Sequence, residues 1–243
     1  MKLGLLPGLG GSLADLGGQL ARVVYYDFAA YGKAFDVTYF SYGDRGSRMV
    51  RVVEAPQIHR YLYQVAMVPR LRDCDVLRVL NFTGSLPGVI AKRLYGCKLV
   101  VGFNYHYEAL ARIHGKPAHA LWLRALLKLV ARTADGVIVP SVALQREVAD
   151  AGYRGMFAHI PNGVDLERFR PCEHRWTVPV ILVVGRDSVE KNLSVVREAV
   201  AQIKGAVLNE VRGLPYAQMP TAYQSASVFV LPSLTEGCSK SLL

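Results

Sequence analysis

Seven apolar runs of strand length recur along the chain and constrain its fold more than any other feature. They are "KLGLL", "FDVTYFSY", "VLRVLNF", "KLVVGFNY", "GVIVPS", "VPVILVVG" and "VFVLP". Each run is rich in valine, leucine or aromatic residues without clean polar alternation, which is typical of strands covered on both faces. Segments with helical spacing lie between them, and one of these has a capping Ser141 and a terminating Gly152. We therefore expect an α/β fold whose parallel sheets are built from right-handed βαβ units.

This alternation breaks once, in the polar stretch "NGVDLERFRPCEHRWTVP", and a new buried strand then begins. We expect a Rossmann-like domain over residues 1–164, a linker over 165–177 and part of a second Rossmann-like domain over 178–243. A ligand would then lie in the cleft between the two sheets, at the carboxyl ends of their strands.

Composition limits the classes of partner and the compartment. The formal net charge is +10, which favours an anionic partner such as nucleic acid, an acidic membrane surface or a phosphorylated small molecule. The four cysteines form no CxxC pair, and no apolar stretch approaches the roughly 18 residues of a membrane span. The N-terminal apolar run is too short for a signal peptide. These features predict a cytoplasmic protein with reduced thiols.

The loop "PGLGGSLADLGG" after the first strand resembles a dinucleotide-binding fingerprint only in part. Leu13 stands where the third glycine would be, and no acidic residue ends the second strand. Gly10 and Gly11 would still let the backbone approach an anion at a helix start. A simple tight turn is the alternative.

The segment "VVGRDSVEKNL" places two cations beside a predicted helix start. Arg186 follows a buried strand directly, and Lys191 lies five residues later. Such a pair suits a diphosphate. The alternative is a solvated loop with ordinary surface charges.

Three segments together, "IPNGVDLERFRP", "VVGRDSVEKNL" and "SASVFVLPSLTEG", resemble the family 4 retaining glycosyltransferases of the GT-B fold. The resemblance implies that Arg186 and Lys191 bind the donor diphosphate and that Glu236, followed by Gly237, contacts the donor sugar. It further implies that His106 faces that sugar, although a hydrogen-bonded loop residue is the alternative reading of this histidine.

The same resemblance implies an enzyme that needs no metal and no cofactor beyond its nucleotide-diphosphate-sugar donor. Gly10 and Gly11 would shape the side of the cleft that binds the acceptor, which could be a glycan, a lipid-linked molecule or a small molecule. The family pairs its first glutamate with a second one eight residues later. That position would be 244, one residue beyond the last, so we expect a longer natural protein truncated here within its second domain.

A catalytically incomplete, glycosyltransferase-like binding or scaffold protein is the alternative function. Nucleic acid is not an expected partner, because the cations are dispersed rather than interleaved with aromatic residues on one basic face. One basic segment could rest on an anionic membrane at its inner face, and its cations are Arg112, Lys116, Arg124, Lys128 and Arg132. A core-facing helix with solvated cations is the alternative there.

Overall fold

The computed structural model describes residues 1–8, 29–40, 51–53, 60–173 and 176–243. The chain forms two compact units, Met1–Tyr105 with Leu121–Pro161, and His106–Ala120 with Asn162–Leu243. Residues 106–120 thus cluster with the second unit although the chain places them between two strands of the first. The boundaries expected at 164 and 178 stay a prediction.

The first unit is built on a parallel sheet, which has seven strands among the described residues, in the order β3-β2-β1-β4-β5-β6-β7. The strands are β1 (Lys2–Leu6), β2 (Asp36–Phe40), β3 (Arg51–Val53), β4 (Val76–Val79), β5 (Lys98–Gly102), β6 (Gly136–Val139) and β7 (Met156–His159). Every neighbouring pair is parallel; for example, Leu3 lies opposite both Val37 and Val76. The predicted α/β class with parallel sheets is confirmed.

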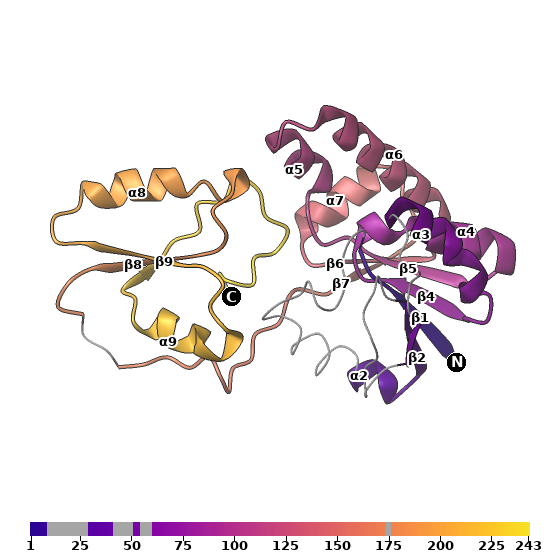
Figure 1. Ribbon diagram of the computed structural model, residues 1–243, viewed down its shortest axis with the longest axis horizontal. Coiled ribbons are helices and arrows are strands. Elements are labelled where there is room, and N and C mark those ends of the chain that lie inside the picture. Colours follow the sequence, from indigo (N-terminus) through magenta and orange to yellow (C-terminus); the bar gives the residue numbers. More distant parts are fainter. Residues whose placement is uncertain (9–28, 41–50, 54–59, 174–175) are drawn as a thin grey trace. The chain divides into compact units, whose positions relative to one another are not determined.

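Helices cover both faces of this sheet. Figure 1 shows α3, α4, α6 and α7 on one face and α2 on the other. These helices are α2 (Ala29–Gly32), α3 (Arg60–Ala66), α4 (Leu86–Tyr95), α6 (Pro117–Thr133) and α7 (Val142–Asp150), joined by the 3-10 turns η3 (Val68–Leu71) and η4 (Phe82–Gly84). Leu5, Leu77, Leu99 and Val139 are fully buried between the layers. The strands are therefore apolar throughout because neither face meets water.

The predicted caps of α7 are present. The Ser141 hydroxyl oxygen accepts a hydrogen bond from the Leu144 amide at 3.4 Å. Gly152 has a φ of 103° just after the helix, a conformation that glycine adopts without steric cost. The sequence thus fixes both ends of this helix locally.

The strand order reverses direction at β1 and β4, and the chain is tightly packed where these strands end. A Cβ atom added at Gly84 would lie 1.9 Å from the Pro7 carbonyl oxygen, and one at Gly8 would lie 2.8 Å from the Asn81 Cβ. Glycine is needed at both positions because a side chain would collide with the Pro7 backbone at residue 84 and with the Asn81 side chain at residue 8. In parallel α/β sheets, such a reversal point is where ligands bind.

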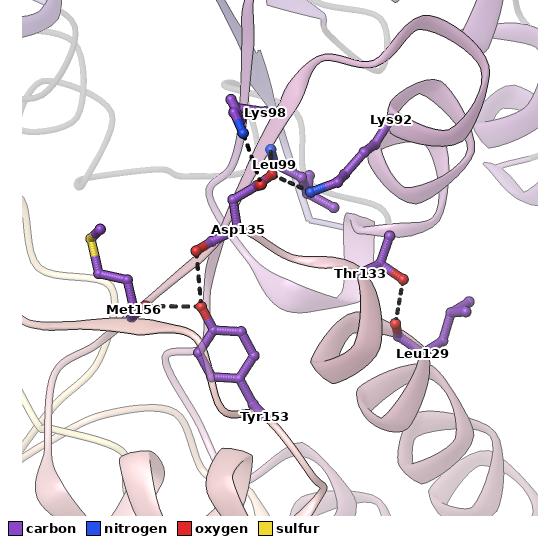
Figure 2. A network of polar contacts seen from close by, with 8 residues as sticks. All are labelled: Lys92, Lys98, Leu99, Leu129, Thr133, Asp135, Tyr153 and Met156. Atoms are coloured by element: carbon purple, nitrogen blue, oxygen red, sulfur yellow. Dashed lines mark hydrogen bonds and ion pairs between the residues drawn. The ribbon is translucent and has the colours of Figure 1, made fainter.

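At the opposite edge of the sheet, Asp135 holds three elements together just before β6 begins. Its carboxylate contacts the Lys92 ammonium of α4, accepts from the Leu99 amide of β5 at 2.8 Å and lies 3.5 Å from the Lys98 Nζ. Figure 2 shows this network and the buried Tyr153, whose hydroxyl lies 3.2 Å from the Asp135 carbonyl oxygen. Asp135 is therefore a structural residue at the edge away from the strand carboxyl ends.

The second unit is built on a smaller parallel sheet, with three strands among the described residues in the order β10-β8-β9. Its elements are β8 (Val180–Val184), η5 (Val189–Lys191), α8 (Leu193–Ala201), β9 (Val207–Val211), η6 (Tyr216–Gln218), α9 (Met219–Gln224), β10 (Val228–Phe229) and, from the inserted segment, α5 (Tyr107–Ile113). Figure 1 shows α8 and α9 on opposite faces of this sheet. Leu193, Val196 and Val200 of α8 pack on Ile181 and Val183 of β8 to form its core.

Among the described residues, no helix combines the length and the apolar character that crossing a membrane requires.

Candidate active site

The candidate site lies where β8 and β10 end. These strands are parallel neighbours, with Ile181 opposite Val228 and Leu182 opposite Phe229. Because the carboxyl ends of parallel strands meet at one edge, the segments that follow them must also lie close together. This topology brings "GRDSVEK" and "LPSLTEG" to the same place.

The turn after β8 is shaped by glycine and closes on Lys191. Gly185 has a φ of 154°, and a Cβ atom there would lie 3.7 Å from Cδ and Cε of Lys191. The Lys191 amide donates to the Ser188 carbonyl oxygen at 2.9 Å. Asn192 then takes the left-handed conformation, φ 51°, before α8 begins. The turn thus folds the lysine side chain back over Gly185.

Arg186 stands on the same turn and is exposed. Within the described part of the chain, no ion pair or hydrogen bond of its guanidinium is found. A guanidinium in this state keeps its planar set of donors available for a phosphate.

Lys191 and Glu236 are brought together by the fold. The Lys191 Nζ lies 2.5 Å from the Glu236 Oε1, and the two side chains are only 19% and 20% exposed. A pair of this kind is worth more than a fully exposed one, because solvent screens it less. The predicted diphosphate lysine and the predicted sugar carboxylate therefore neutralise each other here.

The segment that carries Glu236 is held by several hydrogen bonds. The Leu234 amide donates to the Glu190 carbonyl oxygen at 2.8 Å. The Asn162 side-chain amide donates to the Cys238 carbonyl oxygen at 2.7 Å. Gly237, between these anchors, is buried. The carboxylate is thus presented by a fixed loop.

A network of ion pairs supports the turn behind Arg186. Arg197 of α8 donates to Glu210 of β9 at 2.6 Å and to Asp187 at 2.9 Å, and Arg212 lies 3.1 Å from Asp187. Hydrogen bonds from Arg197 and Arg212 lower the pKa of Glu210 to about 2. Because Asp187 is next to Arg186, this network fixes the backbone from which Arg186 projects.

The other predicted site residues stand as follows. His106 is the N-cap residue of α5 and belongs to the same compact unit as Lys191 and Glu236, although its side chain does not cap the helix. Gly10 and Gly11 lie outside the described residues. The site roles of all seven predicted residues stay predictions.

Three residues that shape the site were not predicted from the sequence. Asn162 anchors the Glu236 loop, buried Glu190 holds Leu234 through its backbone, and His114 contacts the Glu190 carboxylate at 3.0 Å. Asn162 and Glu190 lie inside the quoted motifs, and this position in the sequence could have indicated a role in the site. The residues around His114 gave no such indication, because nothing in the local sequence predicts a contact with Glu190, which is distant along the chain.

Among the residues that the structure describes, no group of three or more histidine, cysteine, aspartate or glutamate side chains could hold a metal ion.

Comparison with known proteins decides the family. The model of Glycosyltransferase Family 4 matches residues 12–168, which is more than half of the chain. The chain belongs to Glycosyltransferase Family 4. This confirms the resemblance inferred from the motifs and the prediction of a glycosyltransferase.

Solved structures of similar fold agree with this membership. Sucrose-phosphate synthase from Thermosynechococcus elongatus has a TM-score of 0.82 at 16% identity, covering 99% of this chain and 77% of that chain. Anabaena HepE in complex with UDP-glucose has a TM-score of 0.63 at 17% identity, covering 94% and 68%. The lipopolysaccharide outer core galactosyltransferase WaaB, in its apo form, has a TM-score of 0.57 at 15% identity, covering 94% and 67%. At these identities the likeness shows the fold, two parallel-sheet domains of the GT-B type.

A comparison with curated protein sequences gave no match.

Proposed function

We propose that this member of Glycosyltransferase Family 4 transfers a sugar from a nucleotide-diphosphate sugar to an acceptor hydroxyl, with retention of the anomeric configuration and without a metal ion. The observation that carries the proposal is the meeting of Lys191 and Glu236 at 2.5 Å, beside the exposed Arg186. One site then holds two cations for a diphosphate and one carboxylate for sugar hydroxyls.

The proposed chemistry assigns each group a role. The bond between the anomeric carbon and the diphosphate oxygen breaks, the acceptor oxygen bonds to that carbon, and the acceptor's proton leaves with the diphosphate. Negative charge grows on the departing diphosphate, so Arg186 and Lys191 would bind the transition state more strongly than the ground state. Glu236 would orient the sugar ring, and His106 would contact the same sugar.

Donor binding would require an exchange of partners. Lys191 would leave the Glu236 carboxylate for a phosphate oxygen, while Glu236 would accept hydrogen bonds from the sugar. Neither group would be left without a polar partner, because the lysine gains a phosphate oxygen and the carboxylate gains sugar hydroxyls. The pair therefore keeps the two groups close to the places where the donor would need them.

The identity of the nucleotide is part of the proposal. We take UDP as the first candidate, since HepE was solved in complexes with UDP-glucose and with UDP. The acceptor would be a glycan, a lipid-linked molecule or a small molecule, and the family resemblance implies that Gly10 and Gly11 help to bind it.

The membrane proposal rests on α6. Arg124, Lys128 and Arg132 of this helix are all exposed, and the spacing of four residues places them along one side of it. Such a strip could contact anionic lipid and bring a lipid-linked acceptor near. Arg112 is not available in the same way, because it pairs with Glu108 at 2.8 Å.

A hydrolysis screen tests the proposed activity. Purified chain would be incubated with UDP-, GDP- and ADP-sugars, and release of the nucleoside diphosphate would be measured. We expect release from one donor class, and chelation of divalent ions should leave it unchanged. Tight diphosphate binding without turnover would instead favour the binding or scaffold protein.

A further inference from the structure

The turn between α5 and α6 places a histidine against the diphosphate-binding turn of the same unit. The His114 Nε2 lies 3.0 Å from the Glu190 Oε2. The Glu190 side chain is only 7% exposed, whereas that of His114 is 35% exposed. Glu190 directly precedes Lys191 in the 3-10 turn η5, and α5 packs on that turn.

Local sequence fixes the position of His114. Gly115 takes a left-handed φ of 67° and ends α5. The Lys116 amide donates to the Ala111 carbonyl oxygen, and the Gly115 amide to the Arg112 carbonyl oxygen, both at 2.9 Å. This pair of bonds is the Schellman motif. His114 is therefore the last residue before a rigid turn, and its side chain starts from a defined point.

The Glu190 carboxylate requires a partner because it is buried. Burial raises the pKa of this carboxyl, but hydrogen-bond donors nearby and His114 outweigh that effect and hold its pKa below the ordinary value. Glu190 is thus ionised at neutral pH. Removing the partner of a buried carboxylate is more disruptive than removing a solvated surface pair.

Glu190 is connected to both members of the candidate site. Its carbonyl oxygen accepts from the Leu234 amide at 2.8 Å, two residues before Glu236. Its peptide continues directly into Lys191, which contacts Glu236. A shift of Glu190 would therefore move the lysine and the loop of the carboxylate together.

We propose that His114 is a positioning residue for the donor site, acting through Glu190 on Lys191 and Glu236 and touching no substrate itself. This rests on the proposed function, because the ligand whose binding it would improve is the nucleotide-diphosphate sugar. His106 begins the helix that His114 ends, so the same contact would also fix that helix on the turn that bears Lys191.

The test compares UDP binding and donor hydrolysis in His114→Ala, His114→Gln, His114→Lys and Glu190→Gln. His119→Gln and Glu198→Gln are matched controls, since both residues are exposed. We expect His114→Ala and Glu190→Gln to weaken UDP binding by roughly three- to thirtyfold, with a lower kcat as well as a higher KM. His114→Lys should recover most of the affinity because it restores a donor beside the Glu190 carboxylate, and both controls should match the wild type.

Several outcomes would overturn the proposal. If the wild type binds UDP and the His114 variants bind it equally well, the positioning role is wrong while the proposed function stands. A lower melting temperature with unchanged kcat and KM, measured well below that temperature, would show a merely structural contact. If His114→Ala does not fold, UDP binding and donor hydrolysis by the less disruptive variant His114→Gln decide whether His114 has a positioning role. A wild type that binds no nucleoside diphosphate would contradict both proposals.

Discussion

The ammonium nitrogen of Lys191 lies 2.5 Å from the carboxylate of Glu236, at the edge of the sheet where β8 and β10 both end. Each group is thereby compensated by the other. A donor must replace this contact before either group can serve it. The pair is consequently the main support for the proposed site. Glu236 also competes with the donor diphosphate for Lys191.

Glu236→Gln should therefore tighten the binding of free UDP while reducing sugar transfer. UDP lacks the donor sugar that residue 236 would contact, so the variant gains from the released Lys191 and loses nothing. We expect a roughly two- to tenfold lower Kd by isothermal titration. Glu198→Gln serves as the control on α8. Weaker UDP binding in Glu236→Gln would show that the pair does not compete with the diphosphate.

Arg186→Ala should reduce turnover of the preferred donor sharply. If the guanidinium stabilises charge that develops on the departing diphosphate, its loss raises the barrier by roughly 2–4 kcal/mol. The measurement is kcat/KM for donor hydrolysis. Arg146→Ala, a change at an exposed position on α7, should leave it unaltered. Equal rates for both variants would remove Arg186 from the proposed machinery.

Asp135→Asn should destabilise the protein by about 1–3 kcal/mol, since a charged hydrogen-bond acceptor is lost. Burial acts to raise the pKa of Asp135, but the Lys92 hydrogen bond, the Leu99 amide and the charges of Lys92 and Lys98 lower it below its ordinary value.

The sign of the pH dependence follows from this lowered pKa. A carboxyl group whose pKa is lower in the folded than in the unfolded protein stabilises the fold at pH values above its pKa in the unfolded protein. This contribution is lost as the pH falls through the pKa of the group in the folded protein, here below about pH 4. Chemical denaturation at several pH values should show that Asp135→Asn loses part of this dependence. Asp150→Asn, at an exposed position on α7, is the control, and an identical acid response of both variants would contradict the assignment.

Glu210 should titrate near pH 2, because Arg197 and Arg212 hold its pKa at about 2. Its contribution to stability would be present at neutral pH and would disappear as the pH falls towards that value. NMR detection of the carboxyl carbon gives the midpoint directly. In Arg197→Met the midpoint should rise towards the ordinary glutamate range. A wild-type midpoint near 4.3, the ordinary value, would show that the network does not form in solution.

Liposome flotation tests the exposed cations of α6. If Arg124, Lys128 and Arg132 contact lipid, the protein should float with vesicles that contain anionic lipid and remain behind with neutral ones. Replacing all three by glutamine should abolish flotation. Indifference to lipid charge would reject the membrane contact.

Much of the fold could be predicted because its strands are buried on both faces. Each of the seven apolar runs contains a strand, and the capping Ser141 marks the start of α7 as expected. Three strands, β3, β7 and β9, lie outside these runs. β7, "MFAH", lies at the sheet edge with both end residues exposed, and β3 has only three residues. Strands of this kind lack the continuous apolar run on which the prediction depended.

The sequence predicted which residues belong to the candidate site, but not which of them contact each other. The motifs named Lys191 and Glu236, yet that they would pair with each other follows only from the adjacency of β8 and β10. The contact of His114 with Glu190 joins a segment inserted between β5 and β6 to the second sheet's unit. Sequence periodicity carries no information about such long-range pairing.

The most direct test of the central claim is calorimetric titration of UDP, GDP and ADP into the wild type, Lys191→Met and Arg146→Ala. The account predicts that at least one diphosphate binds the wild type and Arg146→Ala alike, and that Lys191→Met weakens it by roughly tenfold or more. No binding to the wild type, or equal binding by Lys191→Met, would contradict it.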